Sequence, residues 1–174
     1  EWETHGIDPH QLVLGDYGQL YVANGGVPRT AADKKYDLQR MDSSLVKLDA
    51  KTGRLLQQWQ LEDKRLSMRH LAWSDSPVDG KRYLGIAMQA EHDDPLKRAA
   101  APILAVLAGE KKTKKTRTNK SKDYTGDITA AYNGGFVLSS NQVGLAQLWQ
   151  ASLPDKLTPV VELQEAYAVT SWTG

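Results

Sequence analysis

The sequence predicts an all-β protein of the β-propeller class. A two-strand phrase recurs along the chain, a hairpin follows each copy, and no segment sustains the apolar spacing of a long helix. The clearest copy is PHQLVLGDYGQLYVANGG, from Pro9 to Gly26, and further copies run from Arg69 to Gln89 and from Gly126 to Gly144. A fourth copy begins at Tyr167. Because each propeller blade buries its faces against its neighbours, a unit repeated at this period indicates stacked blades.

Each full copy reads as a short apolar strand, a turn rich in Asp or Gly, and a second strand rich in β-forming residues. The hairpins that follow have their own turn signals. Ser43–Leu61 turns at Lys51–Gly53, Pro102–Lys115 is a shorter version, and Leu145–Leu163 turns around Pro154–Asp155. A phrase and its hairpin together supply four strands, which is the content of one blade.

We therefore expect approximate blades at 9–68, 69–125 and 126–166, with the next blade beginning at 167. Three blades and one further strand cannot close a ring, because natural propellers close with four to eight blades. Residues 1–174 are thus expected to form one domain, a partial propeller. Open blade edges of this kind are expected to permit self-association.

Composition indicates an ordinary folded chain. Of its 174 residues, 40% are hydrophobic and 25% are charged, which disfavours disordered and membrane classes. No apolar run approaches the roughly 18 to 20 residues that span a bilayer, so no transmembrane segment is expected. The chain contains no cysteine, which excludes a disulfide scaffold, a zinc ribbon and a thiol nucleophile.

Basic residues gather in one run, KKTKKTRTNKSK, from Lys111 to Lys122. This run holds seven of the 22 lysines and arginines and no acidic residue. Phosphate groups of a nucleic acid or another anionic surface could bind such a run. A solvated outer strand is the favoured interpretation, since neither interleaved aromatic residues nor a second basic segment appears. Nucleic acid is therefore not an expected partner.

The candidate binding site lies at the starts of the innermost strands. His10 and His70 begin two successive first strands, and His5, Asp8 and Arg69 stand close to them in the sequence. Neutral imidazoles beside carboxylates suit iron, zinc or copper, so a metal ion held by His10 and His70 is the one cofactor that these residues suggest.

Three other interpretations of these histidines stay open: hydrogen bonds to the backbone between blades, an anion site, and acid–base work. Alignment of the copies through their turn glycines matches His10 with Arg69, and His70 comes one residue later. Because side chains alternate faces along a strand, this offset could point the two rings apart. Arg69 itself could bind an anion or pair with Asp8 or Asp37, and we favour the pairing.

No catalytic motif is present, so we predict no catalytic residues and lean towards a protein that is not an enzyme. A metal-dependent hydrolase of the lactonase type, with an axial site, is one alternative function. Such a site needs several carboxylate ligands, and only Asp127 stands at a strand start. The other alternative is an anion or nucleic-acid binder that uses the Lys111–Lys122 run.

The phrases HGIDPHQL, YVANGG, KYDLQRMDSSLVKLDAKTGRLL, LSMRHLA and GIAMQAE occur in this order. In this combination the chain resembles the exported bacterial β-propellers of domain-of-unknown-function family 1513. The resemblance implies a seven-bladed ring of about twice this length, export to the periplasm by a twin-arginine signal, and genes beside imelysin-like proteins in iron-related clusters. It implies no reaction. The leading hypothesis is thus a non-enzymatic periplasmic propeller with an unidentified protein or small-molecule ligand, within an iron-related system.

Overall fold

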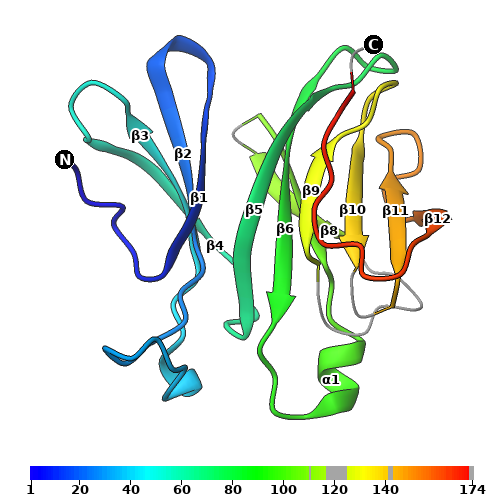
Figure 1. Ribbon diagram of the computed structural model, residues 1–174. Helices are drawn as coiled ribbons and strands as arrows, with labels where there is room; N and C mark the ends of the chain where they lie inside the picture. The colour runs from blue at the N-terminus through cyan, green and yellow to red at the C-terminus, as the bar shows by residue number, and fades with distance from the viewer. Residues whose placement is uncertain (110, 117–124, 141–142, 173–174) are drawn as a thin grey trace. The chain divides into compact units, whose positions relative to one another are not determined.

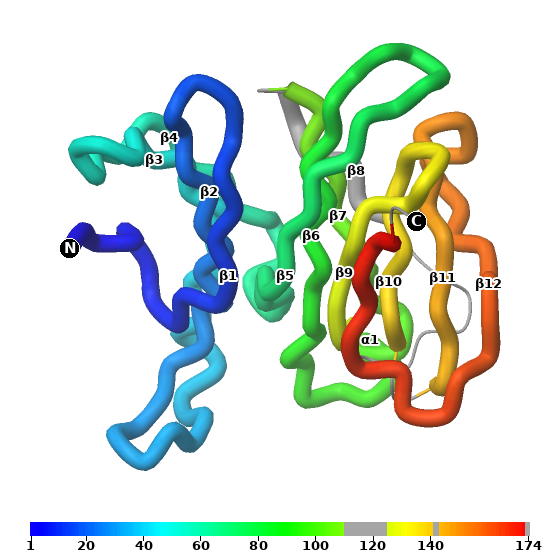
Figure 2. Tube along the Cα trace, turned by 45° about the horizontal axis from the view of Figure 1, so that its top comes forward, coloured from blue at the N-terminus to red at the C-terminus, as the bar shows by residue number. Residues whose placement is uncertain are grey.

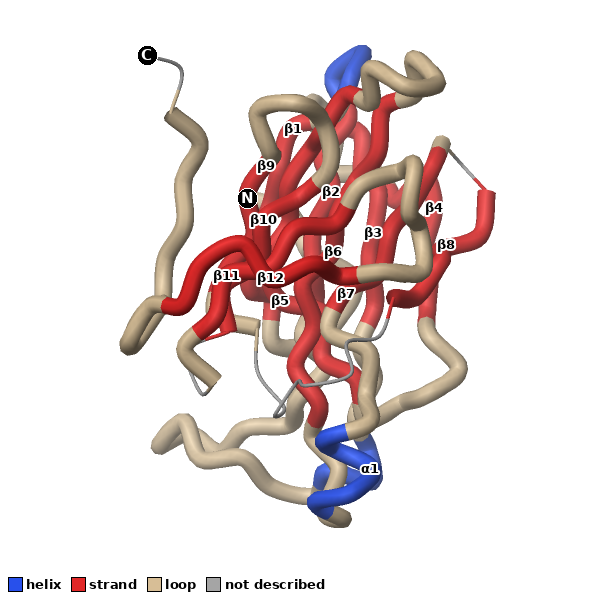
Figure 3. Tube along the Cα trace, turned by 90° about the vertical axis from the view of Figure 1, so that its right-hand side faces the viewer, coloured by secondary structure: helices blue, strands red, loops and turns tan. Residues whose placement is uncertain are grey.

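The computed structural model describes residues 1–109, 111–116, 125–140 and 143–172, with the side chains of 111–116 left out. The chain divides into two compact units, Glu1–His70 and Leu71–Gly174. Strands dominate both units (Figures 1 and 3). They form three four-stranded antiparallel sheets, so the expected all-β fold with four-stranded blades is confirmed.

The first sheet has the strand order β1-β2-β3-β4. Its strands are β1 (Pro9–Leu14), β2 (Gln19–Asn24), β3 (Ser44–Asp49) and β4 (Leu55–Gln60). The turn between β3 and β4 is held by Asp49, whose Oδ1 accepts hydrogen bonds from the backbone N–H groups of Lys51 and Thr52. Gly53 follows at a φ of +71°, a conformation that side chains disfavour. The hairpin predicted at this position is confirmed.

Cross-strand pairing gives the first sheet one continuous apolar face. Leu12 lies opposite Val22, and Val22 lies opposite Val46 on the next strand. Val22, Val46 and Leu48 are buried in one cluster. Because successive residues of a strand point to opposite faces, this row follows directly from the alternation in the sequence.

The second and third sheets have the same simple meander order. The second consists of β5 (Leu66–Asp75), β6 (Arg82–Ala90), β7 (Leu104–Ala108) and β8 (Lys111–Thr116). The third consists of β9 (Asp127–Ala130), β10 (Phe136–Ser140), β11 (Leu145–Trp149) and β12 (Leu157–Glu162). The hairpins predicted after the second and third phrases correspond to β7–β8 and β11–β12.

Helical structure is limited to short connections in the described part of the chain. The helix α1 (Pro95–Ala99) joins β6 to β7 (Figure 1), and its N-cap is Asp94, which accepts from the backbone N–H of Leu96 at 2.8 Å. Two 3-10 turns, η1 (Asp16–Gly18) and η2 (Leu38–Arg40), complete the set. None of the described helices has the length and apolar character needed to cross a membrane.

The core of the second unit forms where the second and third sheets pack face to face. β6 and β7 contribute side chains such as Ala87 and Val106, and the third sheet contributes Phe136, Leu138 and Trp149. The rings of Phe136 and Trp149 stack with centroids 5.5 Å apart. This packing of one four-stranded sheet on the next is the blade-to-blade contact that the repeats predict.

The last described segment of the chain runs beside β9 and β10 (Figure 2). Ser139 Oγ donates to the carbonyl of Tyr167 at 2.9 Å, and the backbone N–H of Val169 donates to Asp127 Oδ2 at 3.2 Å. The segment that begins the fourth copy of the phrase therefore lies against the third sheet.

Candidate functional site

A β-bulge in β1 positions His10. Pro9 pairs with Asn24 and Gln11 pairs with Ala23, so β1 has one residue more than β2 over this step, and that residue is His10. A bulge re-aims the side chain that it carries, because the regular alternation of faces is interrupted there. The one-residue offset between the repeats could turn the His10 ring away from His70. Because of the bulge, that expectation does not apply at His10.

Arg69 lies at the centre of the candidate site. Its Nη1 donates to Nδ1 of His10 at 3.2 Å and lies 3.6 Å from Asp8 Oδ2. The Arg69 side chain is only 6% exposed and that of Asp8 only 10%. The predicted pairing of Arg69 with Asp8 is thus present, whereas Asp37 lies 3.9 Å from Arg40.

A second guanidinium, from Arg29, completes the cluster on the other side of Asp8. Arg29 Nε donates to Asp8 Oδ1 at 2.9 Å. Arg29 lies in the long connection between β2 and β3, where it also contacts the exposed carboxylate of Asp33 at 3.3 Å. Sequence reasoning missed Arg29, because a lone arginine in a long loop has no periodicity or spacing that points to a site.

The local backbone is shaped around the Asp8 carboxylate. Asp8 has a φ of +55°, and its carbonyl accepts from the N–H of Gly25 at 2.7 Å. A Cβ atom at position 25 would lie 2.5 Å from Asp8 Oδ2, so a side chain there would collide with the carboxylate. Ser67 Oγ donates to the carbonyl of Gly25 at 2.7 Å and ties β5 to the same turn.

The two histidine rings meet. Their centroids are 5.1 Å apart and their planes are inclined by 79°, an edge-to-face contact. His5 has a different place: it adopts a φ of +52°, and its carbonyl accepts from Gln58 Nε2 at 3.5 Å. Of the five residues predicted for the site, the structure brings together Asp8, His10, Arg69 and His70. His5 makes its hydrogen bond with Gln58 through its backbone carbonyl.

The electrostatics keep the His10 ring neutral. Partial burial, the charge of Arg69 and the neighbouring His70 ring, in that order, lower the pKa of His10 from 6.5 to about 4. Since a guanidinium can only donate, Nδ1 of His10 must accept and the ring proton resides on Nε2. His10 is solvent-exposed, so its Nε2–H is a donor at the surface of the cluster.

This arrangement suits an anion better than a metal ion. A metal ligated through Nε2 of His10 would have to displace the ring proton beside the positive charge of Arg69. In the described ranges, no three His, Asp or Glu side chains gather in a way that would hold a metal. Metal binding by His10 and His70 stays a prediction, and it has a direct test in metal analysis.

Two alternative functions remain: a lactonase-type hydrolase with Asp127 as a ligand, and an anion or nucleic-acid binder that uses the Lys111–Lys122 run. The described contacts give little support to either. Both oxygens of the Asp127 carboxylate accept from backbone, Oδ1 from Ile128 and Oδ2 from Val169, which is a structural role. Within the Lys111–Lys122 run, the backbone of β8 is described, but residues 117–124 and the side chains of 111–116 lie outside the described residues.

Comparison with known protein families finds a match that extends over residues 1–174. The chain belongs to the family described as protein of unknown function (DUF1513). The resemblance carried by the phrases from HGIDPHQL to GIAMQAE is therefore confirmed for the family itself. No curated protein sequence is similar enough to this DUF1513 chain to count as a match.

Comparison with solved structures also finds matches to the DUF1513 chain. The alpha-L-arabinanase of Penicillium chrysogenum, in complex with arabinobiose, matches 94% of the chain and 48% of its own length, with 13% identity and a TM-score of 0.54. The virginiamycin B lyase of Staphylococcus aureus matches 90% of the chain and 56% of its own length, with 12% identity and a TM-score of 0.46. The chain thus spans about half the length of the arabinanase. At 13% identity the likeness to the arabinanase concerns the propeller-like fold alone.

Proposed function

We propose that this chain belongs to a non-enzymatic β-propeller that binds a small anionic ligand at the cluster of Asp8, His10, Arg29, Arg69 and His70. One observation carries the proposal: the buried Arg69 guanidinium contacts both Asp8 and Nδ1 of His10. That contact makes His10 Nε2–H a donor beside two guanidinium groups.

The donors define the chemistry of the ligand. Guanidinium groups and an imidazole N–H donate hydrogen bonds and accept none, so their partner must be an acceptor. Carboxylates and phosphates match the planar fork of arginine, and charge-assisted hydrogen bonds to them are stronger than neutral ones. The Asp8 carboxylate already shows, within the chain, which group Arg29 and Arg69 recognise.

The same geometry favours binding over catalysis. An efficient general acid or base has a pKa near the working pH. A histidine with a pKa of about 4 is a weak base at neutral pH, and Nδ1 of His10 is already engaged by Arg69. The hydrogen bonds that the Asp127 carboxylate accepts from the backbone of Ile128 and Val169 do not support the lactonase-type alternative.

The proposal extends to a periplasmic location and a role beside the proteins of an iron-related system. Family membership supports both, because the resemblance implies export and that genetic setting. Cell fractionation of the full-length protein tests the location. Recovery in the cytosolic fraction would contradict it.

Isothermal titration calorimetry at neutral pH and low salt, with succinate and inorganic phosphate as probes, tests ligand binding. We expect at least one probe to bind, and we expect Arg69→Gln and His10→Ala to weaken it about tenfold or more, as for a lost charge-assisted hydrogen bond. Arg40→Gln is the matched control, because its side chain is 78% exposed and its ion pair is with Asp37.

Circular dichroism establishes that each variant is folded, which matters most for Arg69 because it is buried. His10 is exposed, so its replacement leaves the core intact. Absence of binding by both probes, or equal binding by wild type and both site variants, would refute the anion site.

A further inference from the structure

Two asparagine–glycine pairs occur in the chain, and the fold gives them opposite surroundings. Of the four asparagines, only Asn24 and Asn133 precede a glycine, and each is followed by two glycines. Asparagine is among the thermolabile residues, because its side-chain amide can react with the backbone nitrogen of the next residue. Glycine has no Cβ atom to hinder that approach. Since the two pairs match in sequence, their reactivity depends on their structural surroundings.

The first pair is held within the first sheet. Asn24 is the last residue of β2 and is fully buried. Its Nδ2 donates to the carbonyl of Thr4 at 2.8 Å and to Ser44 Oγ at 3.4 Å. The N–H of Gly25 donates to the carbonyl of Asp8 at 2.7 Å. These hydrogen bonds join residues far apart in the chain, so the pair can react only when this part of the sheet opens.

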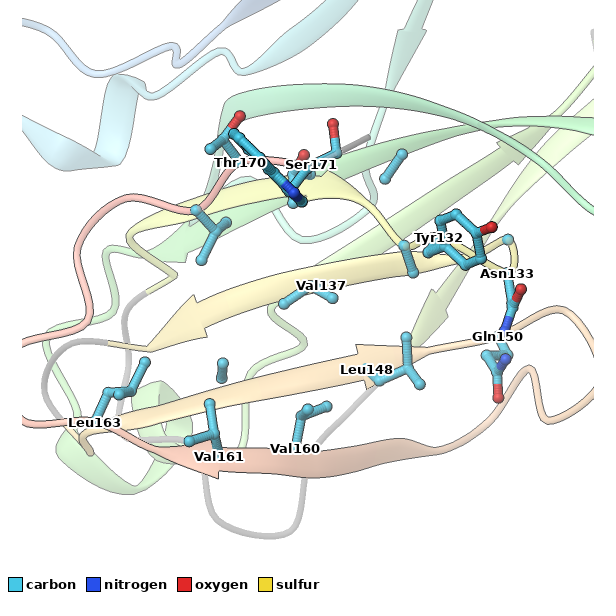
Figure 4. A pocket seen from close by; sticks show the side chains of 17 residues that line it. Tyr132, Asn133, Val137, Leu148, Gln150, Val160, Val161, Leu163, Thr170 and Ser171 are labelled. Carbon is cyan, nitrogen blue, oxygen red and sulfur yellow. The ribbon is translucent and has the colours of Figure 1, made fainter. Parts of the chain in front are cut away.

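The second pair lies in the turn between β9 and β10, at the position of Tyr132 and Asn133 in Figure 4. Asn133 is exposed, and no residue in the described ranges hydrogen-bonds its side-chain amide. It lines an open groove of about 750 Å³, so solvent reaches the amide. The N–H of Gly134 donates to the carbonyl of Ala131 at 3.1 Å. This bond closes a single turn, and it can open without separating the strands on either side.

We propose that Asn133 is a site of spontaneous modification, at which the amide becomes a carboxylate through a cyclic imide with Gly134. The backbone nitrogen of Gly134 loses its proton and bonds to Cγ of Asn133. The bond from Cγ to Nδ2 breaks, and the amide nitrogen leaves as ammonia with that proton. Water then adds to one carbonyl of the imide and opens the ring, which gives aspartate or isoaspartate. The net reaction consumes one water and releases one ammonia.

The modification changes the charge of this turn. Residues 131–135 carry no charged side chain, and either product places one carboxylate among them. A charge-changing modification acts through local electrostatics, and it also makes the modified chain separable by anion exchange. The chain is therefore expected to accumulate a more acidic form with time.

Mass spectrometry of the purified chain, kept folded at mildly alkaline pH and digested at mildly acidic pH, tests the proposal. The peptide that contains Asn133 is expected to gain about one dalton, the difference between an amide and a carboxylic acid. We expect this gain to be at least about tenfold faster than in the peptide of Asn24, whose reaction requires local opening. Two products are expected, and the same peptide from Asn133→Asp identifies the aspartate form.

Two controls separate the effect of the fold from that of the sequence. Asn133→Gln keeps an amide at the exposed position, but its imide would be a six-membered ring, which forms far more slowly, so this peptide is expected to keep its mass. In guanidinium chloride both pairs lose their structural surroundings. Their rates are then expected to agree within about twofold, because unfolded chains retain little local protection.

Two results would overturn the proposal. The Asn133 peptide could keep its mass in the folded chain while it gains mass in the unfolded one, which would show that the turn protects it. The Asn24 peptide could instead react as fast as the Asn133 peptide in the folded chain. That result would show that burial and hydrogen bonding do not distinguish the two pairs.

Discussion

The imidazole ring of His10 lies edge-to-face on that of His70, with centroids 5.1 Å apart. The two residues lie in different strands, since His10 is the second residue of β1 and His70 is the fifth residue of β5. Arg69 Nη1 binds His10 from the position before His70. A neutral His10 is the condition for this arrangement, because a protonated ring could not accept from a guanidinium.

The stability of the fold is predicted to depend on pH through His10. Its pKa is about 4 in the folded chain and 6.5 in a solvated, unfolded one. As pH falls from 6.5 to about 4, the unfolded chain takes up a proton that the folded chain does not, so this contribution to stability is lost in that window. Above pH 6.5 the His10 ring is neutral in both the folded and the unfolded chain, so its contribution to the free energy of unfolding is fully present there.

Urea denaturation at successive pH values measures this dependence. His10→Gln is expected to flatten the profile between pH 6.5 and 4, whereas His5→Gln, outside the cluster, is expected to keep the wild-type slope. An NMR titration that gave His10 a pKa near 6.5 would contradict the prediction.

Metal content separates the two hypotheses for the histidine cluster. The anion site predicts that the purified chain holds no stoichiometric iron, zinc or copper that depends on His10 or His70, because Arg69 engages Nδ1 of His10. The metal hypothesis predicts that it does. Elemental analysis of wild type, His10→Ala and His70→Ala is the measurement. A stoichiometric metal that disappears in both variants would establish the metal site in place of the anion site.

Substitution of Gly26 by alanine is expected to be severely destabilising. Gly26 has a φ of +71°, and a Cβ there would lie 2.1 Å from the backbone N of Ser43. The clash adds to the left-handed strain, for a loss of about 3 kcal/mol or more. Gly80 is the matched control: its φ is +63° but open space surrounds it, so Gly80→Ala is expected to lose only about 1 kcal/mol. Equal losses in urea denaturation would show that the clash is relieved.

The core between the second and third sheets depends on Phe136. This ring is fully buried and stacks on Trp149. Phe136→Ala is expected to lower the free energy of unfolding by about 3 to 5 kcal/mol. Val160→Ala, on the exposed side of the same sheet, is expected to change it by no more than about 0.5 kcal/mol. A small effect at Phe136 would mean that the site collapses around the cavity.

A local hydrogen bond in the β5–β6 turn sets the ionisation of Asp79. The Tyr83 hydroxyl donates to Asp79 Oδ2 at 2.6 Å and lowers the pKa of that carboxyl to about 2, while the pKa of Tyr83 rises to about 12. Tyr83→Phe is expected to return the Asp79 pKa towards its ordinary value of 3.8. Carboxyl NMR titration is the measurement, with the exposed Tyr132→Phe as control. An unchanged Asp79 pKa in Tyr83→Phe would exclude the hydrogen bond as its cause.

Much of the fold was predictable because its signals are local. The hairpin at Lys51–Gly53 combines alternating apolar residues with a local turn signal. Asp49 accepts hydrogen bonds from the backbone N–H groups of Lys51 and Thr52, which follow it by two and three residues. The second sheet shows the limit of such signals: β5 begins at Leu66, before the repeat phrase that starts at Arg69. Strand ends depend on pairing with neighbours, which sequence alone does not display.

The sequence by itself determined the repeated strand pairs, their turns, the all-β class and the family. It also selected four members of the cluster, because Asp8, His10, Arg69 and His70 stand at the starts of repeated phrases. Only the tertiary structure decided that they meet. A bulge at His10 overrides the two-residue alternation, and a long loop brings Arg29 to Asp8. Both depend on hydrogen bonds between residues far apart in the chain, and no local pattern records such pairing.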